Sequence, residues 1–470
     1  MNRLRAAVAL EWTVEWRYRI PAVALVVTVV WTVVLAALPA SVARGAGPVI
    51  LTVDTAAFGA FFIAALVLFE RDEGALAALT VSPVRFGEYL GAKVGGLAGL
   101  SVASAVPVAL AAGVNLAAAL AGVVLLSVLF LTVSFALVVR QPSLTAFLTV
   151  APLPLAPLIA APLAHLTGLL DHPLLFLVPT TAAADVIQGR PHPAGLGYLL
   201  LTVAAAVLVA RGRFTREPVG GPRGGRSHHK PWRPRGWLAA LTGIDRRTSV
   251  RSALLTVVLA GPVLLAVALR LGYPPLVGYL RDRFGVDVTP YQPVLVASLL
   301  LLHVPLITGM VGALLVLDDV DDRTLLVVRV SPVGVRRYLA YRVVAVAAAA
   351  LLLLVVAVPV SGLVPGLPLP AVALAAAQAP LITLATAAVA PNKVEGLGWL
   401  KILGLLPTGI APAMWWLPDA AQWPLRVVPH YWTVDVLWHP GPLGLLAGTV
   451  LTAIAAVLLT RRILRRFDAH

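Results

Sequence analysis

The chain has 470 residues, of which 60% are hydrophobic and only 12% are charged, and its mean hydropathy is +0.92. A water-soluble fold carries roughly 25% charged residues, so the composition excludes a soluble protein and predicts an all-α polytopic membrane protein. The net charge of +15 would suggest nucleic acid as the partner of a soluble domain, but in a membrane protein it first marks cytoplasmic loops, so no nucleic acid is expected. Because the chain has no cysteine, disulfides, thiolate metal sites and thiol nucleophiles are also excluded.

The first predicted element is an interfacial helix ahead of the first membrane span. Glu11, Glu15 and Arg19 recur every four residues and therefore form one polar stripe on a helix. Trp12 and Trp16 lie on the flank of this stripe, and indole rings favour the headgroup zone of a membrane. We expect this helix to lie along the inner membrane surface, in contact with lipid.

Apolar runs long enough to cross about 30 Å of hydrocarbon predict about twelve transmembrane helices, six in each half of the chain. With the N-terminus inside, thirty of the 36 Lys and Arg residues lie on the cytoplasmic side, which predicts that both termini are cytoplasmic. Arginine far outnumbers lysine, as is typical of a GC-rich bacterial genome, so the expected location is a bacterial cell membrane. The predicted spans are 21–38, 49–69, 94–112, 116–139, 144–166, 194–210, 252–269, 293–317, 343–363, 369–390, 398–417 and 442–460.

A polar segment between spans two and three occurs twice. Residues 70–94, the first repeat segment, return at a constant offset of 249 as residues 319–343, the second repeat segment. The chain is therefore an internal duplication, and its two six-span halves point the same way through the membrane, with a substrate path expected between them. The identical pairs are Asp72/Asp321, Leu76/Leu325, Val81/Val330, Ser82/Ser331, Pro83/Pro332, Val84/Val333, Tyr89/Tyr338 and Leu90/Leu339.

The duplication also predicts the domains. Residues 1–210 form the first six-span unit, with its interfacial helix in 1–20, and residues 251–470 form the second. Between them, the linker 211–250 is rich in Gly, Pro and Arg. It is predicted to be a flexible cytoplasmic tether whose positive charge also suits anionic lipid headgroups.

Each repeat segment has the pattern of a docking element. Carboxylates come first, then leucines at helical spacing, then a Ser-Pro pair that resembles the start of a second helix. Such a helix, break and helix can fit a groove on a soluble partner and transmit movement to two spans. An amphipathic loop resting on the membrane is the alternative, which two copies in register disfavour. The candidate docking residues are Glu70, Asp72, Glu73, Leu76, Leu79, Ser82, Pro83, Asp319, Asp321, Asp322, Leu325, Ser331 and Pro332.

The first repeat segment resembles the loop between spans two and three of ABC-2 type exporter permeases. A second feature of that family is similar to 392–396, NKVEG, after the fourth span of the second half. The first half has 141–144, QPSL, at that place, and Arg323 stands in the second half where the first has Gly74, which suggests two non-equivalent partner contacts. The residues that carry the first resemblance are Glu73, Gly74, Ala75, Leu76, Leu79, Ser82, Pro83, Tyr89, Leu90 and Lys93.

The resemblance implies a transport subunit and not an enzyme: two permease units of an ABC exporter fused in tandem. In that family the interfacial helix and the repeat segments contact ATPase subunits, so two copies of a cytoplasmic ABC ATPase are expected as partners. ATP and Mg would be bound by that partner, and this chain would hold no cofactor and no metal. Outer re-entrant segments would correspond to about 168–192 and 418–441. The expected cargo is a hydrophobic or amphiphilic compound such as a drug, an antibiotic or a lipid, with unknown binding residues.

The positions of the lysines indicate whether this chain could bind ATP itself. The chain has four, and none ends a G-x-x-x-x-G-K sequence, so ATP-driven transport requires a separate ATPase polypeptide. An ion-coupled transporter with six plus six spans has the same symmetry but normally needs titratable groups within the bilayer. The polar intramembrane residues are chiefly His165, His303 and Gln378, with Asp54 near the outer end of a span. His303 is the best candidate for a proton relay, and the lack of central charges favours coupling from outside the membrane.

A third alternative is an integral-membrane transferase. His430 and Asp435 are spaced as a conceivable acid/base pair, but they lie in short Pro-rich loops without metal-ligand spacing, which favours a structural role. Elsewhere, Gly91, Gly95 and Gly99 fall on one helix face and predict close helix packing.

Overall fold

The computed structural model describes residues 3–76, 84–168, 170, 172–216, 253–285, 287–321 and 324–468. These residues form helices joined by short connections, without a strand among them, and eleven of the helices are long and apolar enough to cross a membrane. The prediction of an all-α, multi-pass membrane protein is therefore confirmed. The chain divides into two compact units, Met1–His228 and His229–His470. Of the predicted linker, only 211–216 lie in the described part, where they continue the last helix of the first unit.

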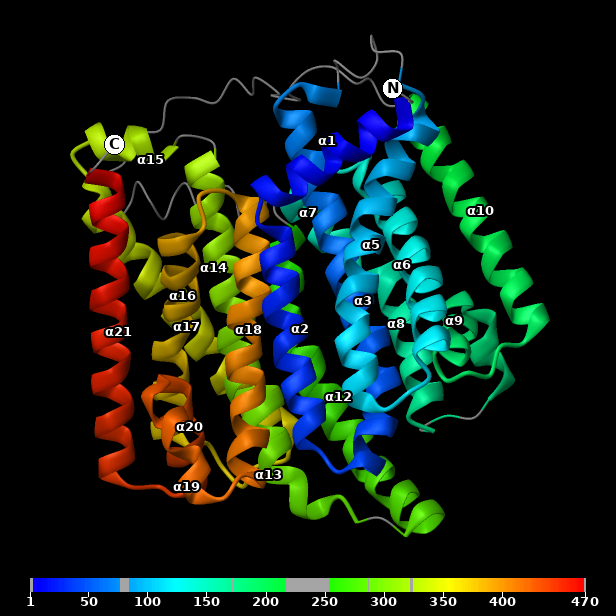
Figure 1. Cartoon of the computed structure of the whole chain (residues 1–470). Helices are drawn as coiled ribbons and strands as arrows, with labels where there is room; N and C mark the ends of the chain where they lie inside the picture. The colour runs from blue at the N-terminus through cyan, green and yellow to red at the C-terminus, as the bar shows by residue number, and fades with distance from the viewer. Residues whose placement is uncertain are drawn as a thin grey trace. The chain divides into compact units, whose positions relative to one another are not determined.

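The first unit is built around α6 (Leu116–Val138), which packs against five other helices of the unit. In Figure 1 the long helices of this unit run roughly side by side, and α1 (Arg3–Arg17) lies obliquely to them. A run without charges makes α6 apolar on every face, which suits a central position. The other helices of the unit are α2 (Ile20–Ala37), α3 (Ala40–Asp72), α5 (Phe86–Ala112), α7 (Leu144–Val150), α8 (Pro152–Leu166), η1 (Pro173–Leu177), α9 (Pro179–Ile187) and α10 (Pro193–Arg216).

The predicted fifth span, 144–166, is the exception among the twelve. The structure divides it into α7 and α8, and α8 alone is too short to count among the eleven long helices. Pro152 stands at the division, and a proline lacks the N–H of a continuous helix and clashes with the preceding turn. Hydropathy alone does not register this break.

The second unit is built in the same way around α17 (Leu369–Val389), which packs against α14, α16, α20 and α21 and is the most buried of the long helices. Its core contains Leu354, Val372 and Ala375. The helices of the unit besides α17 are α12 (Ala253–Phe284), η2 (Thr289–Tyr291), α13 (Gln292–Leu295), the π-helix η3 (Val296–Leu302), α14 (His303–Asp321), α15 (Thr324–Val330), α16 (Gly334–Ser361), α18 (Lys393–Trp416), α19 (Asp419–Gln422), η4 (Trp423–Val427), α20 (Pro429–Trp438) and α21 (Pro442–Asp468).

Gln378 anchors a short helix of the second unit. Its Nε2 donates to the Pro429 carbonyl at 2.8 Å, and its Oε1 accepts from the Thr433 hydroxyl, also at 2.8 Å. Pro429 and Thr433 belong to α20, in one of the two segments predicted to be re-entrant. The polar side chain that the sequence places inside a span therefore ties α20 to α17.

We expect Gln378→Leu to destabilise the second unit by about 1 to 3 kcal/mol, because it leaves the partly buried Pro429 carbonyl and the buried Thr433 hydroxyl without this partner. Thermal unfolding of the purified chain in detergent measures the loss. The double variant Gln378→Leu/Thr433→Val should lose less than the sum of the two single changes. Additive losses would contradict a shared hydrogen bond.

Candidate functional site

The two repeat segments are the predicted site, and the structure describes much of each. Glu70 and Asp72 lie in the last turn of α3, Glu73 follows it exposed, and Leu76 is buried. Of the predicted residues of the first repeat segment, three lie outside the described residues: Leu79, Ser82 and Pro83.

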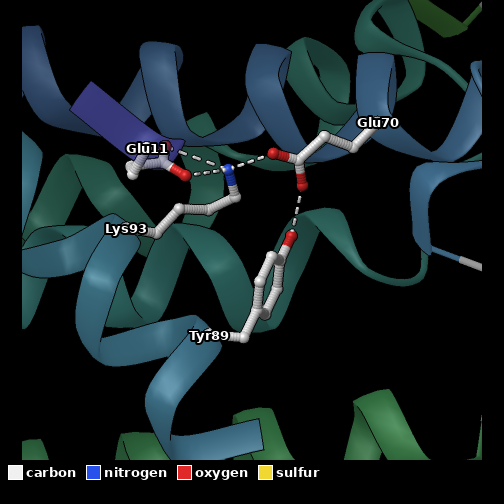
Figure 2. Close-up of polar contacts among 4 residues, drawn as sticks. All are labelled: Glu11, Glu70, Tyr89 and Lys93. Atoms are coloured by element: carbon white, nitrogen blue, oxygen red, sulfur yellow. Dashed lines mark hydrogen bonds and ion pairs between the residues drawn. The ribbon is translucent and has the colours of Figure 1, made fainter. Parts of the chain in front are cut away.

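Lys93 is the centre of a polar cluster in the first unit. This side chain of α5 is fully buried, and its Nζ contacts both carboxylate oxygens of Glu11 at 3.0 Å and Oε1 of Glu70 at 2.5 Å (Figure 2). The Tyr89 hydroxyl donates to Oε2 of Glu70 at 2.6 Å. We call Glu11, Glu70, Tyr89 and Lys93 the first cluster.

The first cluster connects the two long helices on either side of the first repeat segment. Glu70 lies in the last turn of α3, whereas Tyr89 and Lys93 lie near the start of α5, so the contacts close the base of this hairpin. Glu11 adds α1 to the same ammonium group. A buried charge is tolerated only when it is paired and hydrogen-bonded, so the cluster should hold these three helices together.

The second unit contains the same arrangement at the offset of 249. Arg342 of α16 donates from Nη2 to Oδ2 of Asp319 at 2.9 Å and from Nε to the Tyr338 hydroxyl at 3.1 Å. The Tyr338 hydroxyl donates to the same Asp319 oxygen. Asp319, Tyr338 and Arg342, the second cluster, therefore close the hairpin of α14 and α16.

Sequence reasoning quoted Tyr89, Tyr338 and Lys93 only as parts of a pattern, and Arg342 not at all. The signal was available in the alignment of the two halves. At the offset of 249, Glu70 pairs with Asp319 and Lys93 pairs with Arg342, so both the acidic and the basic character are kept. Counting identical residues alone passes over such replacements.

The predicted polar stripe of α1 exists but faces the protein. Glu11 and Glu15 are buried towards α5, whereas Trp12 and Trp16 are exposed. Arg19 is exposed beyond the end of α1, with a left-handed φ of 55° at the turn into α2. The carboxylates of the stripe point towards α5, where Glu11 pairs with the buried Lys93.

The second repeat segment presents an apolar face. In α15, Leu325 is buried beside Leu339 of α16, whereas Leu326, Val327 and Val330 are 51%, 65% and 84% exposed. Asp321 ends α14, and its Oδ2 accepts from the backbone N of Lys393 at 3.3 Å. The predicted Asp322 lies outside the described residues.

The Ser-Pro pair does not start the second helix as predicted. α16 begins at Gly334, two residues after Pro332, and the Ser331 hydroxyl donates to Val328 O at 2.8 Å and accepts from Val333 N at 3.3 Å. A serine commonly makes such a turn, so Ser331 ends α15 instead of capping α16.

The second family feature, 392–396, lies beside the end of α14 in the second unit. Lys393 forms an ion pair with Asp318 near the end of α14, and Asn392 caps α18 by accepting from Glu395 N at 2.9 Å. In the first unit, Ser143 stands at the offset of 249 from Asn392 and caps α7 by accepting from Ala146 N at 3.2 Å. The different sequences therefore make the same cap.

The conceivable acid/base pair of the transferase alternative is arranged differently. His430 is buried and its Nδ1 has no hydrogen-bond partner among the described residues, whereas Asp435 contacts His439 at 3.5 Å. In the first unit His165 and Asp185 are 2.8 Å apart. The described residues contain no group of three His, Asp or Glu side chains suited to a metal ion.

A small hollow lies between α3 and α5 of the first unit, with Asp54, Ser101 and Ser104 among its otherwise apolar lining. At the offset of 249 the second unit has His303 and Leu353 in place of Asp54 and Ser104. The bulkier Leu353 is packed in the hydrophobic core of that unit. The combination of a carboxylate and two hydroxyls is therefore particular to the first unit.

Both halves resemble known proteins separately. A family profile described as "Fluoroquinolones export permease protein family" matches residues 2–217, and one described as "Fluoroquinolones export permease protein Rv2686c-like" matches residues 245–464. Among curated proteins of Mycobacterium tuberculosis (strain H37Rv), the fluoroquinolones export permease protein Rv2687c is 35% identical over 231 residues, 47% of this chain and 98% of the relative. The fluoroquinolones export permease protein Rv2686c is 31% identical over 234 residues, 48% of this chain and 93% of the relative.

Proposed function

The chain belongs to the fluoroquinolones export permease family, whose members are ABC-2 type permeases, and on this premise we propose that separate ATPase subunits drive export through it. In this proposal, one chain supplies both membrane halves of the exporter. Two copies of a cytoplasmic ABC ATPase would bind at the two repeat segments and supply the bound ATP and Mg. Both termini would lie on the same cytoplasmic side.

The exposed apolar face of α15 is the observation that carries this proposal. Leu326, Val327 and Val330 project from a hairpin whose base is closed by the second cluster. Exposed apolar side chains are typical of a contact with a protein or a membrane, and the two copies of the segment in register favour a protein. Because α15 packs against α14 and α16, which the cluster joins, a push on this face would reach two long helices.

The proposed cargo is a hydrophobic or amphiphilic compound, with the fluoroquinolones named for the relatives as the first to examine. The apolar helices of the chain, with few charged side chains, suit such a compound, whereas the hollow beside Asp54 is too small to hold it.

Purification from the native membrane tests the proposed drive. We expect the full chain, extracted in mild detergent, to retain a stoichiometric ATPase that carries a Walker sequence, identified by mass spectrometry. In liposomes, the complex should move substrate only with ATP. A chain that comes away alone and transports with a proton gradient and no ATP would overturn the proposal.

A further inference from the structure

Glu15 is a buried carboxylate that the first cluster does not use. Its side chain is 0% exposed, and neither carboxylate oxygen has a hydrogen-bond partner among the described residues. Its Oε1 lies against the backbone of α5 at Gly96, where an added Cβ would come within 2.4 Å of that oxygen. Glycine at this position therefore makes room for the carboxyl group.

The charges around Glu15 do not balance an ionised carboxylate. Glu11 lies one helical turn away on α1, and Lys93 on α5 is already shared by Glu11 and Glu70. α2 carries no titratable residue, and Tyr89 donates to Glu70. Glu88, also on α5, accepts from the backbone N of Arg85. The surroundings thus offer one buried cation to three carboxylates.

An ionised Glu15 would be a second net negative charge in a buried position without a hydrogen bond, which is very unfavourable. A proton removes that charge and leaves Lys93 to neutralise the other two carboxylates in part. We propose that Glu15 is a proton-binding site, and that its bound proton keeps α1 packed on α5 at the base of the first repeat segment. The site rests on the cluster alone and does not depend on the proposed ATPase contacts.

The direction of the pH dependence follows from the physical causes. Burial first, and then the charge of Glu11, raise the pKa of Glu15 from 4.5 to about 8, against the opposing effect of Lys93. The folded chain therefore holds this proton where the unfolded chain has lost it. The stability that this proton contributes is fully present below the pKa of Glu15 in the unfolded chain, and it is lost as pH rises through the pKa of Glu15 in the folded chain.

Infrared spectroscopy detects the proton directly. We expect the purified full chain in nanodiscs to show a protonated-carboxyl band at neutral pH that disappears as the pH is raised past about 8. Glu15→Gln should abolish this band, whereas Glu73→Gln, which changes an exposed carboxylate, should retain it. A band that is missing from the unaltered chain, or that persists in Glu15→Gln, would overturn the proposal.

Thermal unfolding supplies a second readout of the same variants. The unfolding temperature of the unaltered chain should fall as pH rises between about 5 and about 8, and that of Glu15→Gln should fall less over this range. Identical profiles would count against the site. Because both experiments use the chain without an ATPase, their failure would leave the proposed function untouched, and the reverse also holds.

A pair of neighbouring glycines provides the steric control. Gly96→Ala should displace the Glu15 carboxyl and lower the unfolding temperature at neutral pH, whereas Gly95→Ala should have little effect, since a Cβ there meets nothing within 4 Å. If both substitutions have the same effect, the close packing of Glu15 on Gly96 is wrong.

Discussion

Lys93→Met should destabilise the first unit by about 3 to 5 kcal/mol, because it leaves the buried carboxylate of Glu11 and the partly buried one of Glu70 without their cation. Methionine keeps most of the volume of the lysine stem, so the loss measures the missing charge more than a cavity. The fall in unfolding temperature of the purified chain in detergent is the readout. An unfolding temperature equal to that of the unaltered chain would contradict the charge pairing in the first cluster.

Two further variants distinguish lost pairing from general damage at this position. Adding Glu11→Gln and Glu70→Gln to Lys93→Met removes the unpaired charges and should recover much of the stability. Arg342→Met in the second cluster should cost less than Lys93→Met. There the Arg342 and Asp319 side chains keep 10% and 21% of their exposure, so water can stabilise the carboxylate that remains.

Much of the fold could be predicted because long apolar runs and the positions of basic residues are local signals. The break between α7 and α8 required weighing Pro152 against an otherwise apolar run. The prediction that Gly91, Gly95 and Gly99 pack closely against another helix was wrong within the first unit, for a related reason. A Cβ at Gly91, Gly95 or Gly99 would meet nothing within 4 Å, whereas Gly96 has a close neighbour. Helical spacing shows which glycines share a face, but not which face meets a side chain.

The sequence was enough to locate the two repeat segments, but not the side-chain contacts of the two clusters. The duplication locates both hairpins, yet the partner of Lys93 on α1 lies 82 residues earlier in the chain, and no periodicity connects them. The direction of Glu11 and Glu15 depends on that buried cation. A polar stripe beside two tryptophans fits both a membrane-surface helix and a helix that inserts its carboxylates into the protein. Only the packing of α1 on α5 decides between them.

Leu326→Asp combined with Val327→Asp should remove the ATPase from the purified complex and lower ATP-driven transport at least about tenfold. Each side chain, if buried by a docked partner, contributes about 1.5 to 3 kcal/mol, and about 1.4 kcal/mol already changes an affinity tenfold. Both side chains are exposed in the chain itself, so its unfolding temperature should change little. Co-purification and transport in liposomes measure the first effect, and thermal unfolding measures the second.

The docking proposal also makes a prediction for the first repeat segment. The double variant Asp72→Lys/Glu73→Lys should uncouple ATP hydrolysis from transport without lowering the amount of folded protein. Arg461→Asp, a charge change at an exposed position near the end of α21, is the control and should leave coupling intact. If α15 is altered and the ATPase still binds at full stoichiometry, its exposed apolar face is not a docking surface. If only the α15 change matters, the two repeat segments are unequal partners, as the different residues at Gly74 and Arg323 suggest.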